Sequence, residues 1–151
     1  MFERLERTME PIPEEERVVP DPLLALFAAV PIALVAELTF REQWAIVASL
    51  PAYVSVPVSI ALATAVFWWL SLATGEGARW GRRFALVSGI CQGGVLLAIV
   101  FLRLYVGDAA FRLDVYESTL AVGVSVFGGL LAVFAAIFSF GAGLTWLVSE
   151  R

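Results

Sequence analysis

Two ionisable side chains, Glu37 and Arg103, fall inside long apolar runs of this chain. An unpaired charge within a membrane span costs up to a few kcal/mol, and pairing with an opposite charge offsets that cost. Each residue lies near the same end of its predicted helix, so we expect both side chains at a similar depth. We therefore predict an ion pair between Glu37 and Arg103. The alternative is that each side chain extends separately to the nearby lipid headgroups.

Glu37 also suggests a second chemistry, that of a coupling carboxylate in a small proton-driven transporter. A glutamate in the first helix of a four-helix protein superficially resembles the small multidrug transporters. The resemblance ends there, because Glu37 lies near the end of its helix and the chain has long additional segments. A transporter or channel that uses Glu37 and Arg103 is therefore the alternative function.

Several residue types that carry chemistry are missing. The chain has no histidine and a single cysteine, Cys91, so the usual zinc, haem and iron–sulfur ligand sets and an internal disulfide are excluded. All cationic side chains are arginines, which excludes Schiff-base chemistry on lysine. The serines lack a histidine base, and no metal-loop spacing occurs. We expect no catalytic residues, no cofactor and no metal site.

Composition predicts a membrane protein. Sixty per cent of the residues are hydrophobic and 16% are charged, whereas a soluble domain is roughly half apolar and about one quarter charged. The charges gather at the ends and in short gaps between apolar runs long enough to cross a bilayer. The expected fold is all-α, a polytopic transmembrane four-helix bundle.

Prolines, charges and run lengths divide the chain into two parts. Residues 1–20 form an N-terminal segment, with a short amphipathic helix pattern followed by a linker rich in proline and glutamate. Residues 21–151 form the transmembrane domain, although the division of the long uncharged run at 44–74 stays open. The predicted helices cover residues 21–40, 53–73, 83–106 and 119–148.

The central stretch Gly75–Arg83 is predicted to be a cytoplasmic hinge, because three glycines interrupt it. Its arginines, Arg79, Arg82 and Arg83, are interpreted as topology determinants rather than as a site for anionic lipid or an acidic partner. Seven of the ten arginines fall on the same side of the predicted spans, which predicts that both termini are cytoplasmic. These seven are Arg4, Arg7, Arg17, Arg79, Arg82, Arg83 and Arg151.

Small residues in the third and fourth predicted helices indicate close helix packing, because glycine lets a neighbouring backbone approach. Gln92 lies among them, and we expect it to form a hydrogen bond across a helix interface. The predicted packing glycines are Gly89, Gly93, Gly123, Gly128 and Gly129.

These features predict a non-enzymatic integral membrane protein of the cell membrane, either an accessory or assembly subunit or a small homo-oligomer. Its expected partners are the lipid bilayer and a membrane protein or a second copy; with a net charge of −4, nucleic acid is not expected. The acidic N-terminal segment, the absence of lysine and the Ala/Val/Gly-rich spans resemble the uncharacterised small membrane proteins of salt-adapted archaea. That resemblance implies no activity.

Overall fold

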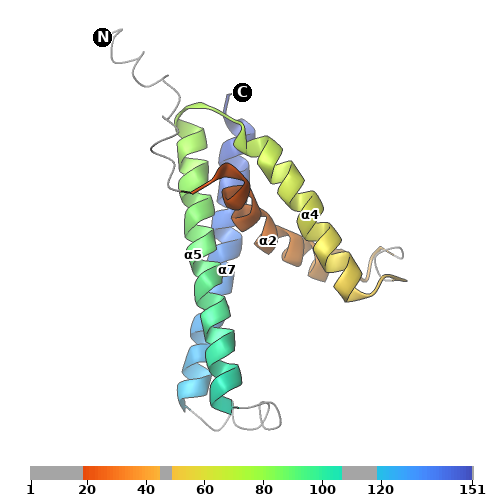
Figure 1. The fold of residues 1–151 in the computed structure, drawn as a ribbon, viewed down its shortest axis with the longest axis vertical. Coiled ribbons are helices and arrows are strands. Elements are labelled where there is room, and N and C mark those ends of the chain that lie inside the picture. The colour runs from red at the N-terminus through yellow and green to blue at the C-terminus, as the bar shows by residue number, and fades with distance from the viewer. Residues whose placement is uncertain (1–18, 45–48, 107–118, 151) are drawn as a thin grey trace.

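A computed structural model describes residues 19–44, 49–106 and 119–150, and these residues form an all-α fold (Figure 1). The predicted N-terminal amphipathic helix and the second loop, residues 108–117, lie outside the described residues. The described helices are α2 (Asp21–Phe40), α4 (Ala52–Ser71), α5 (Gly75–Val106) and α7 (Thr119–Val148). All four are long and apolar enough to cross a membrane.

Prolines set the beginning of the two shorter helices. Pro20 and Pro51 are extended residues that precede α2 and α4, and neither helix has a side-chain cap. Pro22 lies in the first turn of α2, where its missing N–H costs nothing. Pro31, in contrast, lies in the middle of α2 and removes one internal hydrogen bond. The chain places α2 over the range expected from the sequence, and α4 starts one residue early and ends two residues early.

The predicted hinge at Gly75–Arg83 is wrong, because these residues form the first turns of α5. Only Gly75 adopts the left-handed backbone conformation of a turn, with φ of 89°. Gly77 and Gly81 instead lie against α7, where added Cβ atoms would clash with Ser149 and Trp146. These two glycines permit close packing of α5 on α7. The helix begins about two turns before its predicted start at residue 83.

The four helices form two pairs that meet at one end of the molecule. The long helices α5 and α7 pack along each other as a hairpin, and α2 packs on α4 (Figure 1). We name the end where all four meet the convergent end, which holds the start of α2, the turn from α4 to α5 and the end of α7. Away from it, α2 and α4 lean away from the hairpin (Figure 1).

The main core lies at the convergent end. Trp146 of α7 is fully buried there, donates from Nε1 to the Ala78 carbonyl at 3.2 Å, and meets Phe67 edge-on. Small residues of α2, including Ala25, Ala28 and Ala29, complete this core. An ion pair between Asp21 and Arg82, 3.6 Å apart, joins the start of α2 to α5.

The chain end is tied to the same place. The backbone N–H of Thr74 donates to the carbonyl of Glu150 at 2.8 Å, so the α4–α5 turn holds the segment after α7. The start of α2 and the end of α7 therefore both lie at the convergent end of the fold (Figure 1). The helices pack together at the convergent end and separate beyond it. The candidate sites described below lie in these two different surroundings.

Candidate functional site

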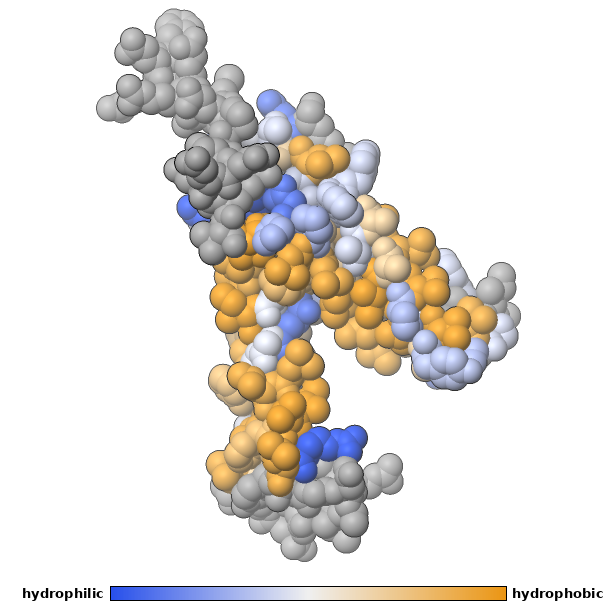
Figure 2. Space-filling model, in the orientation of Figure 1, coloured by the Kyte–Doolittle hydropathy of each residue, from blue (hydrophilic) through white to orange (hydrophobic). Residues whose placement is uncertain are grey.

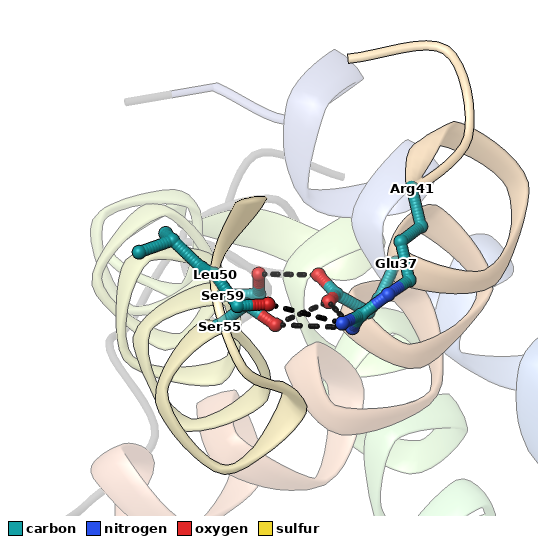
Figure 3. Close-up of polar contacts among 5 residues, drawn as sticks. All are labelled: Glu37, Arg41, Leu50, Ser55 and Ser59. Atoms are coloured by element: carbon teal, nitrogen blue, oxygen red, sulfur yellow. Dashed lines mark hydrogen bonds and ion pairs between the residues drawn. The ribbon is translucent and has the colours of Figure 1, made fainter. Parts of the chain in front are cut away.

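Glu37 lies in the last turn of α2 with its carboxylate directed at α4 (Figure 3). The residue is only 7% exposed. Ser55 donates to Glu37 Oε1 at 2.5 Å, and Ser59, one turn further along α4, donates to Oε2 at 3.2 Å. Both carboxylate oxygens are thus occupied by hydroxyl groups of the neighbouring helix.

Arg41 completes this cluster from the turn that follows α2. Its Nη1 lies 2.9 Å from Glu37 Oε1 and donates to Ser55 Oγ at 3.3 Å. Its Nη2 donates to the Leu50 carbonyl at 3.0 Å, just before α4 (Figure 3). The Arg41 side chain is one-third exposed, so the cluster is buried at the carboxylate and open at the guanidinium. The ion pair balances the charge of Glu37 and ties the end of α2 to the start of α4.

The predicted ion pair between Glu37 and Arg103 is wrong. Glu37 pairs with Arg41, which lies four residues later just after the end of α2, and Arg103 lies in the last turn of α5. Figure 1 shows why: the end of α2 leans away from the hairpin, while the last turn of α5 is at the hairpin's far tip. Equal distance from a helix end implies equal depth only for parallel helices, and α2 is not parallel to α5.

A second polar cluster lies inside the fold, where α2 crosses the hairpin. The amide of residue 31 would normally bond to the carbonyl of Phe27, but proline has no N–H. The Phe27 carbonyl instead accepts from Gln92 Nε2 at 2.6 Å. Weaker contacts reach it from Ser88 Oγ at 3.3 Å and Ser139 Oγ at 3.4 Å. The hydrogen bond predicted for Gln92 across a helix interface is therefore present.

The hydroxyl groups of this cluster also bond to one another. Ser88 and Ser139 are fully buried, with their Oγ atoms 2.7 Å apart. Ser88 also donates to the Ala135 carbonyl at 2.9 Å, and Gln92 donates to Ser88 at 3.1 Å. The cluster therefore joins α2, α5 and α7 through one backbone oxygen. Sequence reasoning missed it, although the spacing of Pro31 from Phe27 is a visible signal for a freed carbonyl.

The five predicted packing glycines divide into two groups. A Cβ at Gly89 would clash with the Phe27 ring, and one at Gly128 would lie 3.1 Å from Ala98 Cβ, so these two glycines contact neighbouring helices. At Gly93, Gly123 and Gly129 an added Cβ would meet no heavy atom within 4 Å in the described residues. These three glycines face outward and leave shallow gaps in the hairpin surface.

The three arginines predicted to determine topology lie in different surroundings. Arg82 turns inward to Asp21, as described above. Arg83 lies over the ring of Trp80, 5.0 Å from its centroid, and is exposed. Arg79, one helical turn before Arg83, is half-buried.

The polar groups of these two clusters hold neighbouring helices together through hydrogen bonds and one ion pair. The described residues contain no group of three histidine, cysteine or acidic side chains that could hold a metal ion. Glu37 is enclosed by donors from the turn after α2 and from α4, and the Phe27 cluster consists of neutral groups. Comparison with known proteins found no match among family models, curated proteins or solved structures.

Proposed function

We propose that this chain is a multi-pass protein of the cell membrane that acts by association, without enzymatic activity. It serves either as an accessory or assembly subunit of a larger membrane complex or as a small homo-oligomer. The four apolar helices support its place in the bilayer. In this proposal the convergent end faces the cytoplasm, which agrees with the surplus of arginines on that side.

The observation that carries the proposal is the surface of the hairpin beyond the convergent end. We name residues 93–106 and 119–134 the distal half of the hairpin. Here α5 and α7 contact each other, while α2 and α4 stand apart (Figure 1). Apolar side chains cover most of the face seen in Figure 2, with a hydrophilic patch at the far tip. Many large side chains of the distal half are more than half exposed, including Leu97 and Leu104 of α5 and Phe127 and Leu130 of α7.

Lipid tails also cover apolar side chains, so exposure alone does not indicate a protein partner. The open glycines Gly93, Gly123 and Gly129 favour one, because they allow a second helix backbone to come closer than at a surface of large side chains. Association in membranes depends on such packing, since lipid and leucine are equally apolar. The distal half is therefore where we place the contact with a partner or a second copy.

The glycines also provide a sharp test. The Cβ of a leucine at Gly93, Gly123 or Gly129 would meet no heavy atom of the described residues within 4 Å, so we expect the substitution to leave the fold intact and to block only close approach from outside. Two differently tagged copies, co-expressed and extracted in mild detergent, measure self-association. A stable complex with another membrane protein is measured in the same extracts.

Val58→Leu is the matched control, because Val58 is an exposed residue of α4 outside the hairpin. We expect at least one of the three glycine variants to lose most of the association, and Val58→Leu to retain it. Retention of the same association by all three glycine variants would refute the placement of the contact.

One observation favours a second candidate, a small transporter. Glu37 is a buried carboxylate within a helix long enough to span the bilayer, and such residues often mark proton or ion pathways. Arg103, which the sequence paired with it, is not part of that cluster. Flux in vesicles that is lost in Glu37→Gln would support the transporter, and flux that is unchanged would remove Glu37 from it.

A further inference from the structure

The first turns of α5 have two opposite faces. One face holds Gly77, Ala78, Gly81 and Ala85 and packs against α7, with the last three of these residues buried. On a helix of 3.6 residues per turn, Arg79 and Arg83 lie on the opposite face, one turn apart. The tight glycine contacts with Ser149 and Trp146 thus fix the direction in which the two arginines face.

The side chains of these two arginines do not tie helices together within the described fold. Arg82 forms the ion pair with Asp21, whereas neither Arg79 nor Arg83 forms an ion pair with an acidic side chain of the described residues. Glu76 lies one turn before Arg79 and is exposed, but it pairs with neither. The outward face therefore carries the exposed Arg83 and the half-buried Arg79, each with several N–H donors.

Trp80 places this face at the membrane boundary. Its ring is half-exposed, lies beside Arg83 at 5.0 Å and packs against Phe84, with 5.9 Å between the two ring centroids. Tryptophan and arginine both favour the headgroup region, and the stretch of α5 without charged residues begins at Phe84. The arginines accordingly lie where lipid phosphates are.

Below the arginines the same face becomes apolar. Leu86 and Ile90 continue the line of Arg79 and Arg83 along the helix, at 38% and 67% exposed. A ligand held by its phosphate at the arginines would thus find an exposed apolar strip for an acyl chain. A free phosphate ion would gain nothing from that strip.

We propose that Arg79 and Arg83, with Trp80 beside them, bind the phosphate of an anionic phospholipid in the leaflet at the convergent end. The guanidinium groups donate to the phosphate oxygens, and both reach one headgroup because residues four apart are neighbours on a helix. The strip formed by Leu86 and Ile90 holds an acyl chain. This inference does not depend on association of the chain, so either proposal can fail alone.

Native mass spectrometry of the full-length protein in detergent tests the proposal. The probes are phosphatidylglycerol, an anionic lipid, and phosphatidylcholine, a zwitterionic one. We expect wild-type protein to retain phosphatidylglycerol preferentially. The Arg79→Gln/Arg83→Gln variant should lose that preference, by roughly fivefold for each arginine removed. Arg79→Lys/Arg83→Lys should keep part of it, because the charges remain.

Two controls keep the result specific. Arg103→Gln removes one arginine from the far end of α5, and it should leave lipid binding at wild-type level. Glycerol phosphate, the soluble headgroup fragment, should not displace the lipid. Equal phosphatidylglycerol binding by wild type and the double glutamine variant would overturn the proposal. An equal loss in Arg103→Gln, or displacement by glycerol phosphate, would do so too.

Discussion

The side-chain amide of Gln92 donates a 2.6 Å hydrogen bond to the carbonyl oxygen of Phe27, on a different helix. That carbonyl is available because Pro31, four residues further on, has no N–H to offer it. A break in the hydrogen bonding of α2 is therefore repaired by α5, with Ser88 and Ser139 nearby. Within a bilayer such a repair matters more than at a wet surface, because water is not available to the carbonyl.

Removal of the Gln92 amide should destabilise the fold. We expect Gln92→Leu to lower the free energy of unfolding by about 1–2 kcal/mol, the range for one hydrogen bond to a buried group. In a Pro31→Ala background the restored amide of residue 31 satisfies the Phe27 carbonyl, so the loss should shrink by about 1 kcal/mol. Unfolding of the four proteins in mixed micelles measures this coupling. Equal losses in both backgrounds would disprove the repair.

The ion-pair partner of Glu37 can be tested by comparing two double-mutant cycles. Glu37→Gln combined with Arg41→Gln should show a coupling energy of about 1 kcal/mol, reduced from that of a fully buried pair by the exposure of Arg41. Glu37→Gln combined with Arg103→Gln serves as the matched control and should show none. Coupling to Arg103 of the same size as coupling to Arg41 would contradict the arrangement in Figure 3.

Two glycines one turn apart on α5 should respond in opposite directions to alanine. Gly89→Ala places a methyl group against the Phe27 ring and should destabilise the protein by about 1–3 kcal/mol. Gly93→Ala meets open space and should stabilise α5 by up to about 1 kcal/mol, through helix propensity. Unfolding in micelles compares them. Similar effects at both positions would mean that α2 does not cross α5 at Gly89.

The orientation of the chain can be tested with single cysteines in a Cys91→Ala background. Glu76 and Glu150 are exposed at the convergent end, and Gln43 is exposed after α2. We expect a membrane-impermeant maleimide to label Gln43→Cys in intact cells. Glu76→Cys and Glu150→Cys should be labelled only after permeabilisation. Labelling of Gln43→Cys and Glu76→Cys from the same side would rule out the proposed crossing of α4.

Sequence patterns predict the helices well and their arrangement poorly, for a physical reason. Apolar run length defines a membrane-spanning helix, so the all-α fold and the bounds of α2 and α7 follow from the sequence. The role of a glycine depends on what lies beside it. Gly77 and Gly81 interrupt no helix, because α7 packs closely against them. Local propensity gives way there to tertiary contact.

The candidate site shows the same division. The buried carboxylate of Glu37 is visible from the sequence as a charge in an apolar run. Its partner is not, because the choice between Arg41 and Arg103 depends on the direction in which α2 leans. The Phe27 cluster is partly predictable, since Pro31 must free one carbonyl. Which side chain reaches that carbonyl depends on the crossing of α2 over the hairpin.

The central claim is that the chain acts by association in the membrane, and the native mass of the protein tests it most directly. The protein should be extracted gently from its own membrane and its mass determined with bound detergent subtracted. We predict a defined species heavier than one chain, either a whole-number multiple of the chain mass or a complex with one other membrane protein. A species with the mass of a single chain in several mild detergents would contradict the claim.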